Sequence, residues 1–260
     1  MVLGKEQPDS APLALPCGGC LGCRTDKARQ WALRCHLELQ SHESAVFTTL
    51  TYADDQAPPT LAKSDLSGFL KRVRKALPGG VRFFASGEYG ERTNRPHYHA
   101  LLYGPSVADA RRIEAAWGHG FTRTEAVTPA RIAYVAGYCQ KKIGYKLHAR
   151  ECVDPSTGEV FAWQPPFIQM SRRPGIGANA KRWPESWRLF GVHNGREMPV
   201  PRYLHEAWRN NATALETESL DYEKSQRRLQ LGRDLSPARL AAAEEIAAAR
   251  HSLRGARRSL

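Results

Sequence analysis

Residues 96–104 read PHYHALLYG, and this stretch predicts the central strand of the fold and a binding site on it. The apolar residues that follow the histidines predict a strand over residues 96–103 that is anchored in the core. Side chains alternate between the two faces of a strand, so His97 and His99 share one face while Tyr98 packs on the other. Two imidazoles on one face can bind one metal ion between them.

Composition and apolar spacing predict the elements on either side of this strand. They are a strand over residues 45–52, a helix over 66–77, a strand over 81–88, the strand over 96–103, a helix over 106–117, a strand over 121–127 and a helix from Thr128. This β-α-β-β-α-β order, followed by a helix, predicts an α+β, ferredoxin-like antiparallel sheet of about five strands with helices on one face. The histidine strand would lie inside the sheet, and residues 161–170 could add a further strand.

Three parts of the chain differ in composition. Residues 1–43 form a Cys-rich segment and a helix from Asp26 to about Gln40, and residues 44–200 form the domain that contains the sheet. Residues 201–260 are charged and Ala-rich, with few large apolar residues to anchor a core. We expect this tail to be helical, or disordered without a partner.

The formal net charge of +12 predicts an acidic partner. Nucleic acid is the leading candidate, although an anionic membrane surface or an ordinary soluble protein would also fit this charge. The chain contains no apolar run near the ~20 residues that span a bilayer, and its N-terminus lacks the pattern of a secretory signal. We therefore expect cytoplasmic residence and no membrane partner.

A carboxylate is predicted to complete the metal site. Glu88 lies on the strand that forms a hairpin with the histidine strand, so its side chain can reach both imidazoles; Glu91, in the connecting loop, is the second choice. Two imidazoles and one carboxylate leave positions open for water and a phosphate oxygen, as a catalytic metal requires. These ligands suit a transition metal, whereas phosphate chemistry commonly uses Mg²⁺ or Mn²⁺. The alternative is a pair of histidines that only form hydrogen bonds.

Tyr134 and Tyr138 are the candidate nucleophiles, because residues four apart on a helix share a face. A phenol with a pKa near ~10 needs help to attack phosphorus, and Lys141 or Lys142, one turn further on, could stabilise the phenolate. Attack would link a 5′ phosphate to the tyrosine and release a 3′ hydroxyl, so that the strand can later be rejoined. The alternative is an amphipathic helix whose tyrosines pack on the sheet.

Four cysteines lie close together in the sequence near the N-terminus. Cys17, Cys20, Cys23 and Cys35 could bind zinc, with His36 as an alternative fourth ligand. Reduced thiols that bind no metal are an equally good interpretation, because the usual two separated CxxC pairs are absent.

Basic residues near the histidines and after the sheet are candidate contacts to DNA phosphates. They are Arg92, Arg95, Arg172, Arg173, Lys181 and Arg182, and Trp183 and Trp187 could stack on unpaired bases. For any one of them, a solvated basic surface is the simpler interpretation.

Three segments together resemble a known family. FTTLTY (residues 47–52), GEYGERTNRPHYHALLYG (87–104) and YVAGYCQKK (134–142) resemble the ordered motifs of rolling-circle replication initiators of the HUH endonuclease superfamily. The likeness is greatest to the initiators of gokushovirus-type microviruses, which are small single-stranded DNA phages, and residues 16–35 resemble their N-terminal segment. The tail has no part in the resemblance.

The resemblance implies an HUH-type fold and a metal-dependent nickase. His97, His99 and Glu88 fall on the metal ligands, Tyr134 and Tyr138 on the paired nucleophiles, and Lys141 or Lys142 on the assisting lysine. The implied activity is site-specific nicking of single-stranded or melted origin DNA through a 5′-phosphotyrosine link, with later rejoining in rolling-circle replication.

Two partners and two rival functions complete the expectations. The chain contains no GxxxxGK[ST] motif, so a host helicase would unwind the duplex, and a host polymerase would copy it. One rival is a non-catalytic nucleic-acid-binding protein. The other is a tyrosine transposase of the same superfamily, in which one tyrosine is the commoner expectation.

Overall fold

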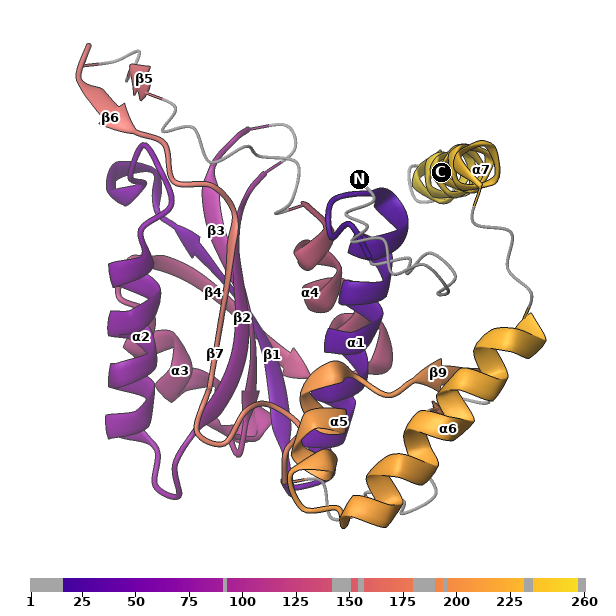
Figure 1. The fold of residues 1–260 in the computed structure, drawn as a ribbon. Helices are drawn as coiled ribbons and strands as arrows, with labels where there is room; N and C mark the ends of the chain where they lie inside the picture. The colour runs from indigo at the N-terminus through magenta and orange to yellow at the C-terminus, as the bar shows by residue number, and fades with distance from the viewer. Residues whose placement is uncertain are drawn as a thin grey trace.

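The computed structural model describes residues 16–90, 93–141, 151–153, 157–179, 190–193, 196–231 and 236–256. The sheet and the helices packed on it are α1 (Leu21–Leu39), β1 (Ala45–Tyr52), α2 (Lys63–Ala76), β2 (Arg82–Tyr89), β3 (Pro96–Tyr103), α3 (Ala110–Trp117), β4 (Gly120–Ala126), α4 (Pro129–Lys141) and β7 (Phe167–Met170) (Figure 1). The remaining elements are the short helices η1 (Asp54–Gln56) and η2 (Val107–Asp109), the strands β5 (Glu151–Val153), β6 (Val160–Ala162), β8 (Phe190–His193) and β9 (Arg196–Pro199), and the helices α5 (Arg202–Arg209), α6 (Ala214–Leu231) and α7 (Pro237–Ala256).

Five strands form one antiparallel sheet in the order β4-β1-β3-β2-β7. The predicted β-α-β-β-α-β order is confirmed, and β3, which carries the histidines, is the central strand. The further strand expected within residues 161–170 is β7, which pairs with β2. The adjacent β6 pairs instead with β5 in a separate hairpin.

Helices cover both faces of the sheet, so the prediction of helices on one face was wrong. Figure 1 shows α2 and α3 on one side and α1 and α4 on the other. The reason lies in β3, where Ala100 and Leu102 are buried under α2 and α3 while Leu101 and Tyr103 are buried on the opposite face. A sheet that is apolar on both faces needs a second layer of helices to exclude water.

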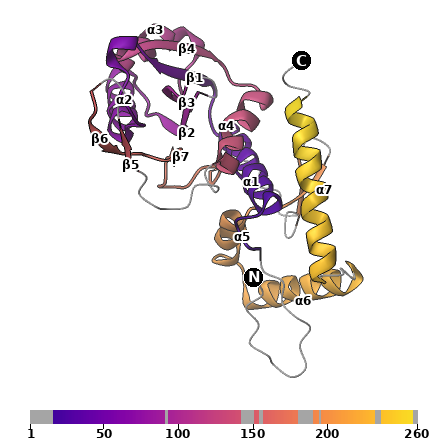
Figure 2. The ribbon, with the colours of Figure 1, turned by 90° about the horizontal axis from the view of Figure 1, so that it is seen from above.

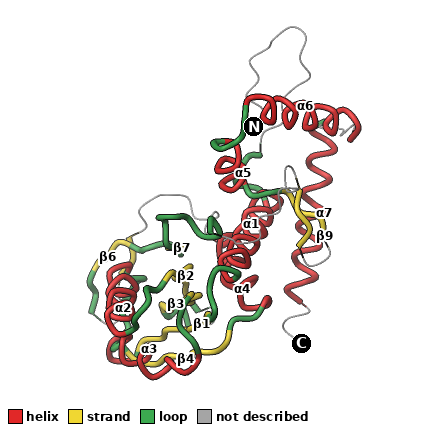
Figure 3. Tube along the Cα trace, turned by 90° about the horizontal axis from the view of Figure 1, so that it is seen from below, coloured by secondary structure: helices red, strands yellow, loops and turns green. Residues whose placement is uncertain are grey.

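The N-terminal helix and the tail contact each other beside this second layer. Leu204 of α5 is buried against Leu33 and Leu37 of α1, and α7 also contacts α1. Figures 2 and 3 show α6 and α7 lying away from the sheet, beyond α1. The tail is therefore helical over most of its described residues, and the division of the chain into three parts stays a prediction. Among the described helices, none has the length and apolar character needed to span a membrane.

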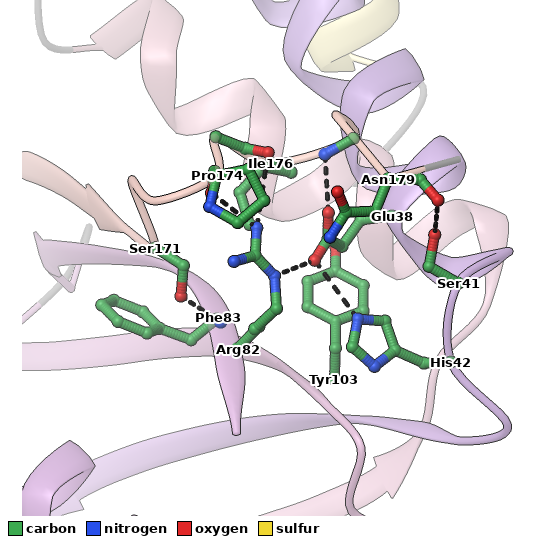
Figure 4. Close-up of polar contacts among 12 residues, drawn as sticks. Glu38, Ser41, His42, Arg82, Phe83, Tyr103, Ser171, Pro174, Ile176 and Asn179 are labelled. Atoms are coloured by element: carbon green, nitrogen blue, oxygen red, sulfur yellow. Dashed lines mark hydrogen bonds and ion pairs between the residues drawn. The ribbon is translucent and has the colours of Figure 1, made fainter. Parts of the chain in front are cut away.

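A buried carboxylate joins α1, β2 and the segment after β7 (Figure 4). Glu38 accepts hydrogen bonds from the Arg82 guanidinium, from the backbone N–H of Gly177 at 2.6 Å and from Nε2 of His42 at 3.2 Å. Burial opposes ionisation of Glu38, but the hydrogen bonds from Arg82 and Gly177 outweigh it and lower the pKa of Glu38. The stabilisation is therefore present above the ordinary carboxyl pKa and is lost as the pH falls through the lowered value.

Replacing Glu38 by Gln is expected to lower the free energy of unfolding by about 3 kcal/mol, because it leaves the Arg82 cation largely buried without its counter-charge. Urea titration followed by circular dichroism measures the change. Asp26→Asn is the matched control, since it removes an exposed ion pair with Arg29 on the same helix and is expected to change little. Equal effects of the two variants would contradict this account of Glu38.

Candidate active site

The β2–β3 hairpin brings Glu88, His97 and His99 together on one face of the sheet. Glu88 pairs directly with His97 across the hairpin, and Oε1 of Glu88 lies 2.9 Å from Nε2 of each histidine. One ligand atom from each residue lies within 4.8 Å of the others. The structure therefore places the three predicted metal ligands close enough to bind one ion.

Contacts at the other ring nitrogens hold the two imidazoles in place. Nδ1 of His97 lies 3.1 Å from the carbonyl oxygen of Arg95, so Nδ1 carries the proton and Nε2 is left for a ligand bond. Nδ1 of His99 lies 3.0 Å from the hydroxyl of Thr49 on β1. Thr49 was not among the predicted site residues. The signal that could have identified it is its position in FTTLTY, because Thr49 pairs with His99 across the β1–β3 ladder.

A buried hydroxyl lies beside this group of ligands. Ser86 pairs with His99 and points to the same face as Glu88, two residues further along β2. Its Oγ atom is buried and has no hydrogen-bond partner among the described residues. A buried hydroxyl without a partner costs roughly 1–3 kcal/mol. Its position fits a site that holds a hydrated metal ion, since a coordinated water could satisfy it.

Glu88 is in the protonation state that a metal ligand needs. Burial alone would raise its pKa, but hydrogen bonds with His97 and His99 outweigh burial and lower the pKa of Glu88 to about 2. The carboxylate is therefore ionised at neutral pH. The residues present fit a divalent metal ion with two nitrogen ligands and one oxygen ligand.

Helix α4 brings both candidate nucleophiles to the same three residues. The hydroxyl of Tyr134 lies 3.4 Å from Nε2 of His99. The ring of Tyr138 stacks on His99 with centroids 5.7 Å apart, and its hydroxyl forms a hydrogen bond with Glu88. Ile132 and Val135 anchor the helix, because they are buried against the sheet on the apolar stripe of α4.

The two tyrosines differ in their access to solvent. Tyr134 is 43% exposed, whereas Tyr138 is only 7% exposed. Burial, followed by hydrogen bonds with Glu88 and Tyr134, raises the pKa of Tyr138 far above its ordinary value. The phenol that a DNA strand can reach without any rearrangement is therefore that of Tyr134.

Several predicted residues lie outside the part of the chain that the structure describes. The side chain of Lys141, at the end of α4, is one of these, and the others are Glu91, Arg92, Lys142, Lys181, Arg182, Trp183 and Trp187. Their roles stay predictions.

The described basic residues differ in their surroundings. Arg95 forms an ion pair with Asp54 and donates a hydrogen bond to the carbonyl of Tyr52 at 2.8 Å, so it ties the start of β3 to the end of β1. Arg172 and Arg173 are exposed just after β7. Their contact with DNA stays a prediction.

Three of the four N-terminal cysteines form a group at the start of α1. The thiols of Cys17, Cys20 and Cys23 lie within 4.8 Å of one another. The helix begins at Leu21, five residues before the predicted start, because the side chain of Cys20 caps it by accepting a hydrogen bond from the N–H of Cys23. The N–H of Cys20 donates to the sulfur of Cys17 and is the main cause that lowers the pKa of Cys17 to about 7. A lowered pKa favours the thiolate that binds metal.

Cys35 does not belong to this group, so its prediction as the fourth zinc ligand was wrong. Cys23 and Cys35 lie in one continuous helix, twelve residues and therefore ~18 Å apart along its axis. Cys35 is fully buried in the core between α1 and the sheet. His36, the alternative ligand, is separated from Cys23 by the same helix.

Purified protein is expected to retain zinc through the group of three cysteines. Replacing Cys17, Cys20 and Cys23 together by Ser should remove it, while Cys35→Ala, the control, should leave the zinc content unchanged. Metal analysis by mass spectrometry after dialysis measures this. Stoichiometric zinc in the triple variant would contradict the assignment.

Comparison with known proteins was consistent with the geometry of the site. Residues 45–143 match a family of replication-associated proteins of the ORF2 type. The chain is 28% identical over 238 residues to "Replication-associated protein VP4" of Bdellovibrio phage phiMH2K, a match that covers 80% of this chain and 71% of that protein. It is 30% identical over 159 residues to "Replication-associated protein ORF2" of Spiroplasma virus 4, covering 51% of this chain and 50% of that protein.

Two further comparisons are more distant. The chain is 26% identical over 163 residues to "Replication-associated protein ORF4" of Chlamydia phage 1, covering 54% of this chain and 41% of that protein. Among solved structures, "hypothetical protein ORF119" from Sulfolobus islandicus rod-shaped virus 1 matches with a TM-score of 0.32 and 20% identity, covering 42% of this chain and 90% of that chain. That similarity is too weak to support an inference.

The fold and these comparisons define the class of this protein. It belongs with the rolling-circle initiators of the microvirus type, as its motifs predicted. Its relatives carry the name of replication-associated proteins of small phages.

Proposed function

We propose that this protein initiates the replication of a small single-stranded DNA phage by nicking origin DNA. One observation carries the proposal: the hydroxyl of Tyr134 lies 3.4 Å from an imidazole that also belongs to a group of three metal-ligand side chains. A nucleophile and an electrophilic centre on one face are what phosphoryl transfer to tyrosine requires. The names of the relatives support the replication role.

Glu88, His97 and His99 would hold the metal ion. When bound, Mg²⁺ or Mn²⁺ would polarise the scissile phosphate and neutralise charge that develops on it. Arg95 and Thr49 hold the two imidazoles through their Nδ1 atoms, so both Nε2 atoms face the same point. Preorganised ligands of this kind lose little freedom when the ion binds.

Tyr134 would act first, because its phenol is the accessible one. The phenol loses its proton as its oxygen forms a bond to phosphorus. The bond from phosphorus to the 3′ oxygen breaks, and that oxygen takes up a proton and leaves as a 3′ hydroxyl. Lys141 or Lys142 would stabilise the phenolate.

Tyr138 would take part in a second transfer. Its hydroxyl contacts Glu88 and its ring stacks on His99, so it is within reach of the same phosphate position once the buried contacts open. With two tyrosines, the protein could hold one DNA end while it cuts again after a full circle. A host helicase and a host polymerase would supply the unwinding and the synthesis.

Covalent capture of a labelled oligonucleotide tests the proposal. Single-stranded phage origin DNA is incubated with the protein and Mg²⁺ or Mn²⁺, and the products are separated under denaturing conditions. A metal-dependent adduct that is resistant to boiling and sensitive to protease is expected. Binding without an adduct would favour the non-catalytic nucleic-acid-binding protein. Adducts formed only on the ends of a mobile element would favour the transposase.

A further inference from the structure

The edge strand β4 presents two exposed side chains on the same face as the candidate active site. Phe121 pairs with Thr51 of β1, which in turn pairs with His97 of β3. Arg123 pairs with Thr49, which in turn pairs with His99. Directly paired residues in a sheet point to the same face. Phe121 and Arg123 therefore lie in the same two rows as the histidines, two strand spacings or ~10 Å away.

Phe121 is unusually open for a phenylalanine in a sheet. It is 69% exposed, whereas the other phenylalanine on this face of the outer strands, Phe47, is covered by α4 and stacks on His99. Helix α4 covers only the end of the sheet that carries Phe47, so the end that carries Phe121 is left open. An open aromatic ring in line with a phosphate-cleaving site is the surface on which an unpaired base stacks.

The backbone holds the Phe121 ring in a defined position. Gly120, which precedes it, has φ +141°, and a Cβ atom there would lie 2.2 Å from the nitrogen of Ala53 and 2.7 Å from the carbonyl oxygen of Thr51. Only glycine allows this close approach of β4 to the end of β1. Phe121 is therefore fixed to the strand that pairs with β3, and little ordering is needed when a base binds.

Arg123 adds the charge that a nucleic-acid strand would meet. Its side chain is 78% exposed and forms an ion pair with Glu125 at 3.2 Å. Glu125 also pairs with Arg131 of α4 at 2.5 Å, so Glu125 keeps a partner if Arg123 turns to a phosphate. An exposed ion pair of this kind stabilises the protein little, so exchanging it for a phosphate contact costs little.

Resting on the proposed function, we propose that Phe121 and Arg123 form a binding site for one nucleotide of the single-stranded DNA that flanks the scissile phosphate. The base stacks on Phe121, and its phosphate pairs with Arg123. The threonines Thr49 and Thr51, which are small and partly exposed, separate this nucleotide from the histidines. The site selects unpaired DNA, because a base inside a duplex cannot present its face to the ring.

The test uses origin oligonucleotides that each carry one 2-aminopurine base, a fluorescent base whose emission changes on stacking. The full chain is titrated in EDTA, so binding is measured without cleavage. A change in emission is expected at one position beside the cleavage site. Phe121→Ala is expected to abolish that change and to weaken binding about tenfold, while Phe121→Tyr retains both. Arg123→Gln is expected to reduce the slope of log affinity against log salt by about 1.

Tyr222→Ala is the matched control, since Tyr222 is 64% exposed on α6, away from the sheet. Unchanged emission and affinity in Phe121→Ala, with thermal unfolding like that of the wild type, would overturn the proposal even if the protein forms its adduct with DNA. Stacking at Phe121 in a protein that forms no adduct would instead leave this binding site standing and refute the nickase. The two proposals can therefore fail separately.

Discussion

Replacing Tyr134 and Tyr138 together by Phe is expected to abolish the covalent adduct with origin DNA and to leave DNA binding intact. The change removes the two phenolic oxygens and keeps both rings, so the stacking of residue 138 on His99 and the packing of α4 are preserved. Loss of the nucleophile is expected to lower adduct formation below detection, because no other described tyrosine reaches the three metal-ligand side chains. Denaturing electrophoresis of a labelled oligonucleotide measures the adduct, and fluorescence anisotropy measures binding.

The single variants separate the roles of the two tyrosines. Tyr134→Phe is expected to remove most of the first adduct, since Tyr134 is the accessible phenol. Tyr138→Phe is expected to spare the first adduct and to block the second transfer, seen as loss of rejoined circles. Tyr222→Phe on α6 is the control and is expected to behave as the wild type. An adduct that persists in the double variant would show that a different residue is the nucleophile.

Replacing His97 and His99 together by Ala is expected to abolish binding of Mn²⁺ as well as cleavage. The change removes both nitrogen ligands and leaves Glu88 alone, and a single carboxylate does not hold a divalent ion at micromolar concentration. Mn²⁺ binding is measured by electron paramagnetic resonance or calorimetry, which do not depend on activity. His205→Ala on α5 is the control, because His205 lies on the tail, away from the metal-ligand group.

A second variant protects this test against misfolding. The His97→Ala and His99→Ala changes leave the buried Glu88 carboxylate without two of its hydrogen bonds, so circular dichroism must show that the fold is kept. Glu88→Gln keeps the shape of the site and removes the charge, and it is expected to weaken Mn²⁺ binding strongly. Thr49→Val, which removes only the contact to Nδ1 of His99, is expected to weaken it about tenfold. Unaltered Mn²⁺ affinity in the histidine variant would place the metal elsewhere.

Local pattern was enough to predict the site because its spacing is short. His97 and His99 share a face by the alternation of one strand, and Glu88 reaches them across one hairpin. Tyr134 and Tyr138 share a face by the repeat of one helix. In each case the geometry follows from backbone periodicity within a few residues, which the amino-acid order specifies directly.

The N-terminal cysteines mark the limit of that reasoning. Cys17, Cys20 and Cys23 come together because they lie at the cap and first turn of α1. Cys35 is equally close in the amino-acid order to expect a common site, yet the helix continues without a break and carries Cys35 into the core. The error came from placing the helix start five residues too late.

Contacts between distant segments are where prediction from the amino-acid order stopped. The second helical layer, the burial of Glu38 by residues more than forty positions away and the alignment of Phe121 and Arg123 with the histidines all depend on strand order and register. These features arise from packing between elements, and the chain carries no short-range signal for which elements will be neighbours. Periodicity along the backbone thus identified the metal-ligand and tyrosine residues, while the assembled sheet set which helix faces them and which side chains remain open beside them.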